Sequence, residues 1–181
     1  MTDSTPAGGE PVETYANPHS SLYRVRVAPS AFTRLEAAEL ANAALGALSD
    51  AFALLQDWYG EGANWDEAHG NLQYGYDGAT IKPEVFGAMD VGYWFHMIWN
   101  EPRAGHRNQV TFMIPNQPAD HFATPSHVFN ETPIMSLSVH RQYLSDIDSQ
   151  SLVESLERVF SPSRIDVIPV GSTAPIDLYK A

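Results

Sequence analysis

The spacing of apolar residues between positions 35 and 59 constrains the fold more than any other feature of this sequence. Apolar side chains recur there at steps of three and four, the period of one face of an α-helix. Ser30 is a suitable N-cap, and Gly60 and Gly62 favour an end just after the apolar stripe. The spacing predicts one amphipathic helix of roughly seven turns, whose core-facing residues are Leu35, Ala38, Ala41, Leu45, Leu48, Phe52, Leu55 and Tyr59.

Five other segments have the alternation or the short apolar runs of β-strands, namely residues 22–27, 91–99, 109–114, 134–139 and 165–168. In residues 91–99 the odd-numbered positions are the more apolar. We therefore expect them to face the core, with His96 at a helix–sheet margin. A second helix is predicted at residues 148–160, capped by Asp148 or Ser149 and ended by Pro162. Residues 71–80 are typical of a loop.

This order of elements predicts one α+β domain in residues 21–181. We expect an antiparallel sheet of about five strands, with a long N-terminal helix and a C-terminal helix packed on one face. A length of 181 residues suits a single domain. Residues 1–20 are rich in Pro, Gly, Ser, Thr and acids, which indicates a flexible tail. Residues 115–133 contain four prolines and are predicted to form a long surface loop.

The composition excludes several kinds of protein. There is no cysteine, so disulfides, thiolate nucleophiles and zinc–cysteine sites are excluded, which fits a cytoplasmic location. The N-terminal residues lack the basic and apolar regions of a Sec signal peptide. No apolar run approaches the roughly 18 residues of a transmembrane helix. We therefore expect neither export nor insertion in a membrane.

The charge is strongly negative and unevenly placed. The 22 acidic and 10 basic residues give a formal charge of −12, and no Lys or Arg occurs between Arg34 and Lys82. Such a chain repels nucleic acid and anionic membranes and attracts a basic protein. Aromatic residues lie among the later acids, so we predict a partner-binding surface formed by Asp57, Tyr59, Glu61, Trp65, Asp66, Glu67 and Asp77. The alternatives are a merely solvated acidic face and an interface in residues 115–133.

Signatures of catalysis are absent from the sequence. It has no GxSxG, no HExxH and no phosphate-binding glycine loop, so we expect no enzyme, no catalytic residue, no cofactor and no metal. One alternative stays open, a small hydrolase that uses His96 or the pair His121 and His127. It would need a cleft joining those histidines to Asp120 or Asp90.

Three local patterns carry a resemblance to a known family. The first is the helix end from Phe52 to Trp58, followed by a glycine and by Trp-Asp-Glu-Ala at residues 65–68. The second is Val-Gly-Tyr at residues 91–93, leading to the pair Trp99 and Asn100. The third is the helix, proline turn and strand at residues 152–168. Over roughly residues 22–169, the chain resembles the immunity protein 52 family of bacterial polymorphic toxin systems.

The resemblance implies a non-enzymatic inhibitor whose partner is a cognate toxin, a nuclease domain with a basic active-site cleft. An acidic surface competes for such a cleft, and the opposite charges raise the association rate. The alternative is an acidic DNA mimic or adaptor, which would space its carboxylates in a double row at phosphate-like intervals. The sequence does not indicate an oligomeric state.

Overall fold

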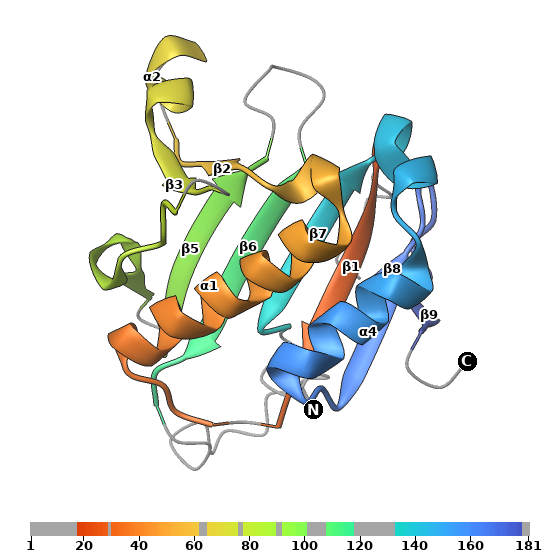
Figure 1. Cartoon of the computed structure of the whole chain (residues 1–181). Helices are drawn as coiled ribbons and strands as arrows, with labels where there is room; N and C mark the ends of the chain where they lie inside the picture. The colour runs from red at the N-terminus through yellow and green to blue at the C-terminus, as the bar shows by residue number, and fades with distance from the viewer. Residues whose placement is uncertain are drawn as a thin grey trace, which may run out of the picture.

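The computed structural model describes residues 18–28, 30–61, 65–75, 78–89, 92–100, 108–117 and 133–178, and of Trp65 only the backbone. These residues form an antiparallel sheet with two main helices in front of one face (Figure 1). The predicted α+β class is confirmed. The predicted tail lies outside the described residues up to position 17, and its last residue, Ser20, opens the first strand.

The sheet has nine strands in the described residues, not about five. Its order is β3-β2-β5-β6-β7-β1-β8-β9, with β4 paired to β5. The five predicted strands correspond to β1 (Ser20–Arg26), β5 (Tyr93–Trp99), β6 (Gln109–Pro115), β7 (Met135–His140) and β8 (Arg164–Ile168). The other four are β2 (Trp58–Tyr59), β3 (Leu72–Tyr74), β4 (Gly87–Met89) and β9 (Ile176–Asp177). Two or three residues are too few to show a period of two, and β3 lies in a segment predicted as loop.

The long helix, α1 (Arg34–Ala51), starts later than predicted. Thr33, not Ser30, is its N-cap. The Thr33 hydroxyl accepts the Glu36 N–H at 3.2 Å, and the Glu36 carboxylate accepts the Thr33 N–H at 2.7 Å. These reciprocal bonds form a capping box, and the bond from the Thr33 N–H lowers the pKa of Glu36. Leu35 is exposed instead of buried.

α1 also ends earlier than the apolar stripe. Phe52 has extended backbone angles and stops the helix, and a single 3₁₀ turn follows at Ala53–Leu55 before β2. Phe52 and Leu55 are nevertheless buried in the same core as the helix. The prediction of a seven-turn helix was therefore wrong. The spacing of apolar residues indicates which residues contact the core, and a 3₁₀ turn after the helix can continue the same spacing.

The C-terminal helix, α4 (Ser149–Phe160), confirms the prediction. The Asp148 carboxylate accepts the Ser151 N–H at 2.8 Å, so Asp148 is the N-cap, and this bond lowers its pKa. α1 and α4 pack side by side on the same face of the sheet (Figure 1). The smaller elements are α2 (Trp65–Gly70) and 3₁₀ helices at Pro83–Val85 and Arg141–Asp146.

The even-numbered residues of β5 face the helices, which contradicts the predicted orientation. Ile98 is fully buried and lies opposite Val110, and His96 lies opposite buried Phe112. The Trp94 indole donates to the carbonyl of Phe32, just before α1, at 2.8 Å. The prediction was wrong because both faces of β5 carry large apolar side chains. The odd-numbered side chains therefore lie on the face away from α1 and α4.

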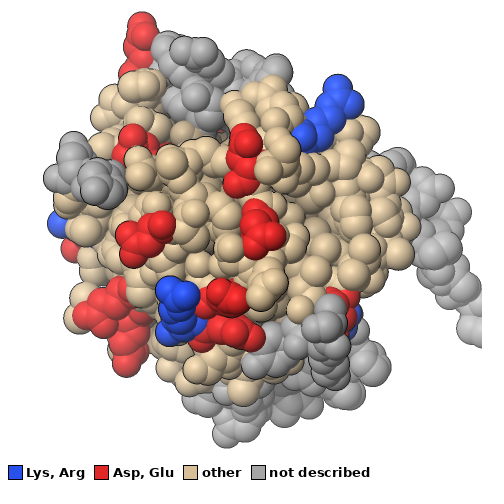
Figure 2. Space-filling view, turned by 45° about the vertical axis from the view of Figure 1, so that its right-hand side comes forward, with Lys and Arg blue, Asp and Glu red and all other residues tan. Residues whose placement is uncertain are grey.

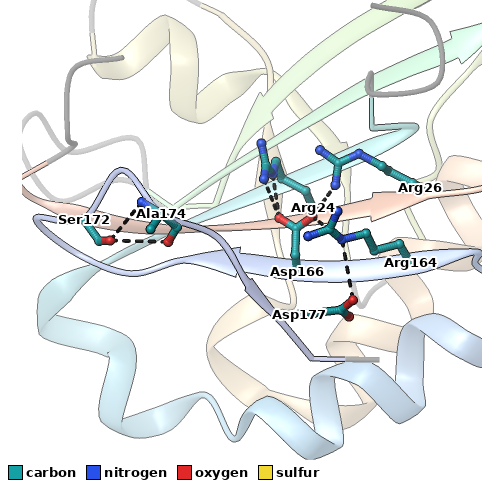
Figure 3. Close-up of polar contacts among 7 residues, drawn as sticks. All are labelled: Arg24, Arg26, Arg164, Asp166, Ser172, Ala174 and Asp177. Carbon is teal, nitrogen blue, oxygen red and sulfur yellow. Dashed lines mark hydrogen bonds and ion pairs between the residues drawn. The ribbon is translucent and has the colours of Figure 1, made fainter. Parts of the chain in front are cut away.

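The face of the sheet away from the helices carries an ion-pair network (Figure 3). Asp166 on β8 is fully buried, and both Arg24 and Arg26 of β1 bind its carboxylate; Arg24 does so at 2.7 Å. Arg164 lies 3.4 Å from Asp166 and 3.7 Å from Asp177. The network joins β1, β8 and β9 and fixes their register.

Candidate functional site

Most of the predicted partner-binding residues lie in one part of the structure, which we call the edge unit (residues 57–61 and 65–75). It consists of β2, α2 and β3 at the outer end of the sheet. In Figure 1, α2 stands clear of the rest of the molecule beyond the top of β5. Segments that the sequence showed only as a charged, irregular stretch thus form a single projecting surface.

The acidic residues of the edge unit are exposed. Asp57 and Glu61 flank β2, and Asp66 and Glu67 occupy the first turn of α2. Tyr59 is half-buried, and its ring lies 5.0 Å from that of His69. Asp77 and the side chain of Trp65 lie outside the described residues. The structure therefore brings together five of the seven predicted residues, namely Asp57, Tyr59, Glu61, Asp66 and Glu67.

Trp58 does not belong to this surface. Its side chain is fully buried in the core, and its indole donates to the Leu55 carbonyl at 3.0 Å. Trp58 therefore packs in the core just after the end of α1. The buried Trp58 side chain thus fixes β2 to the core, while the neighbouring Asp57 faces solvent.

Two asparagines that the sequence analysis did not assign a role attach the edge unit to the sheet. The Asn100 amide donates to the carbonyls of Leu54 and Asp57 at 2.7 and 3.1 Å. Asn100 in turn accepts a bond from Asn108, which is fully buried. The resemblance pointed to Asn100 as half of a Trp-Asn pair, but only the fold shows that its amide holds the backbone of Asp57.

A second set of polar contacts shapes the end of β2. The Gln73 amide donates to the Asn71 side chain at 2.5 Å, and the Asn71 amide donates to the Glu61 carbonyl at 3.0 Å. Gly60 lies so close to the side chains of Asn71 and Gln73 that a Cβ at position 60 would be 2.4 Å from Asn71 Nδ2. Glycine at position 60 thus permits the contact that fixes the backbone of Glu61.

Two hollows lie next to β2. The smaller, of about 220 Å³, is lined by Asp57, Tyr59, His69 and Asn100 among others. The larger, of about 400 Å³, lies between the edge unit and the outer edge of β5, and we call it the edge notch. Its lining includes Glu61, Asn71, Val85, Phe95, Met97 and Trp99. Each hollow thus has one exposed carboxylate residue in its wall.

His96 is half-buried, beside the core, and also lines the edge notch. Burial lowers its pKa to about 4, so the imidazole is neutral at pH 7. The ring lies 5.3 Å from that of Phe86, and its buried Nε2 has no hydrogen-bond partner among the residues that the structure describes. The other parts of the hydrolase alternative, Asp90, Asp120, His121 and His127, lie outside the described residues, as does most of the 115–133 loop.

Among the described residues, no three or more His, Asp or Glu side chains converge in a way that would hold a metal ion. No helix in the described part of the chain has the length and apolar content needed to cross a membrane.

The acidic side chains on the face shown in Figure 2 form several separate patches, with few basic side chains between them. On this face the acidic side chains are not confined to one patch, so the edge unit is distinguished by its projection and its hollows rather than by charge alone.

Comparison with known proteins gives no relative, since neither a protein-family model nor a curated protein matches the chain.

Proposed function

We propose that this protein is an immunity protein that binds and neutralises a cognate bacterial nuclease toxin through the edge unit. The toxin is the basic partner that the resemblance to the immunity protein 52 family implies. The protein acts as an inhibitor, without chemistry of its own, in the cytoplasm of the cell that makes the toxin.

One observation carries the proposal: four exposed acidic residues, Asp57, Glu61, Asp66 and Glu67, lie on one projecting unit in a stretch without Lys or Arg. Like charges gathered on a protruding surface produce a negative potential that attracts a basic cleft. Because nuclease active sites gather positive charge to hold phosphates, the surface and the cleft are complementary.

The same unit offers contact area besides charge. Tyr59 and His69 pack together beside the smaller hollow, and the edge notch lies between the edge unit and β5. Aromatic residues and hollows are the features that hold a complex after charge has brought the partners together. Charge thus governs association, and the hollows govern the lifetime of the complex.

Co-expression tests the proposal. The toxin domain is taken as the C-terminal domain encoded by the neighbouring upstream gene, and survival of cells producing it is measured with and without this protein. We expect survival only with this protein, and loss of survival with the double variant Asp66→Lys, Glu67→Lys.

The matched control is Glu39→Lys, Glu157→Lys, which changes the net charge equally at two exposed positions on α1 and α4. We expect the control to protect like the wild type. Equal killing with and without the wild-type protein would refute the proposed function. Full protection by the edge-unit variant would refute only the position of the surface.

A further inference from the structure

The edge notch is a gap in the pairing of β5. On its outer edge β5 pairs with β4 from Tyr93 to Phe95 and with β2 at Trp99. Met97 lies between these two contacts, where neither strand supplies a partner. The notch is therefore bounded by strands at both ends and has part of a strand edge as its floor.

The peptide groups of Met97 point into this gap. In an antiparallel ladder the N–H and C=O of one residue point to the same side, and successive residues alternate. The Asn100 N–H bonds to the Asn108 carbonyl, on the β6 side, at 3.0 Å. Three residues earlier in the strand, the N–H and C=O of Met97 must point the other way, toward the notch.

The chemistry of the notch suits a cation with several donors. The Met97 carbonyl is a hydrogen-bond acceptor on the floor of the notch. Glu61 contributes an exposed carboxylate, and the Asn71 side chain holds the backbone of Glu61 in place. Phe95 and Trp99 lie on the same side of β5 as Met97 and bring aromatic rings to the lining. None of the described residues that line the notch is Lys or Arg. A guanidinium group binds carboxylates and carbonyls through its fork of N–H donors and stacks on aromatic rings.

We infer that the edge notch binds an arginine side chain of the partner. This inference rests on the proposed function, because a nuclease cleft is where a basic protein exposes arginines. The guanidinium donates to the Glu61 carboxylate and to the Met97 carbonyl and lies against Phe95 or Trp99. The site thus adds a defined anchoring contact to the general attraction of the acidic surface.

A short peptide tests the notch without the toxin. The probe is N-acetyl-glycyl-arginyl-glycinamide, compared with the same peptide carrying citrulline, which keeps the shape of arginine but not its charge. Both are titrated into the full-length ¹⁵N-labelled protein by NMR. We expect the arginine peptide to shift the Met97 amide and Trp99 indole signals in a saturable way, and the citrulline peptide to leave them unchanged.

Two variants complete the test. Glu61→Gln removes the carboxylate at an exposed position, and we expect it to weaken arginine-peptide binding about fivefold. Glu39→Gln removes a carboxylate on α1, and we expect no change. Equal shifts from both peptides, or equal binding by Glu61→Gln and the wild type, would overturn the inference even if co-expression shows protection. Arginine binding without protection would instead refute the proposed function and leave the notch as an arginine site.

Discussion

The side-chain amide of Asn108 donates to Oδ1 of Asn100 at 3.0 Å, and this bond connects the sheet to the surface proposed to bind the toxin. Asn108 also accepts the backbone N–H of His140 at 2.9 Å, so β7 contributes to the same network. Through Asn100 the network reaches the carbonyls of Leu54 and Asp57. The position of β2 relative to β5 thus depends on two neutral amides.

Replacement of Asn100 by Ala should destabilise the protein by about 1–3 kcal/mol, because it leaves partly buried carbonyls without a donor. The free energy of unfolding is measured in urea. Asn116→Ala is the control, since no side-chain bond from Asn116 occurs in the described structure, and it should change stability by less than about 0.5 kcal/mol. Equal effects of the two substitutions would contradict the role of the Asn100–Asn108 pair.

Asp166→Ala should destabilise the protein by about 3 kcal/mol or more, because it leaves Arg24 and Arg26 half-buried without their carboxylate. Asp177→Asn is the comparison, because Asp177 is partly exposed and pairs at 3.7 Å with the exposed Arg164, so its loss should cost less than about 1 kcal/mol. Thermal and urea unfolding of both variants measure the difference. Similar losses for the two would show that burial of Asp166 has no special weight.

Stability should fall as the pH drops from about 6.5 to about 4, in part because of His96. The pKa of His96 is about 4 in the folded protein and near 6.5 in the unfolded chain, so below pH 6.5 the unfolded chain binds the extra proton. The contribution of neutral His96 to the free energy of unfolding is complete above pH 6.5 and is lost on acidification toward pH 4. It amounts to roughly 3 kcal/mol at most. His96→Phe should flatten this part of the pH profile of unfolding. A variant profile parallel to that of the wild type would contradict the burial of His96.

Thr33→Ala should cost about 1 kcal/mol, since it removes the hydroxyl that caps α1. Ser30→Ala, at the cap position that the sequence suggested, should have almost no effect. Urea unfolding of the two variants compares them directly, and a larger loss for Ser30→Ala would place the start of the helix where the sequence put it.

These particular residues show what the sequence determines and what it does not. α4 was predicted with its cap because Asp148, the apolar spacing and Pro162 all act within about fifteen residues of chain. β2, β3, β4 and β9 were missed because their two or three residues are held by neighbouring strands, not by local preference. The predicted orientation of β5 was wrong because its two faces are similarly apolar. Trp94 and Ile98 face the helices, and Phe95 and Trp99 on the opposite face are just as apolar.

The candidate surface was likewise predictable only in part, because some of its features are local in the sequence and others depend on contacts between distant segments. Charge and aromatic content are visible in the sequence, so Asp57, Glu61, Asp66 and Glu67 could be proposed from it, and the structure shows only that they lie on one unit. The amides that position them were not, because Asn100 and Asn71 act through carbonyls supplied by other segments. The edge notch, too, exists only because β2 and β4 leave Met97 uncovered between them.

Binding kinetics between this protein and a catalytically inactive form of the toxin domain encoded upstream test the proposed role of the edge unit most directly. We predict an association rate that falls steeply with added salt, and a further fall of more than tenfold for Asp66→Lys, Glu67→Lys. The control Glu39→Lys, Glu157→Lys should associate at close to the wild-type rate. Absence of binding, or an equal loss of rate in the two double variants, would contradict a toxin-binding role for the edge unit.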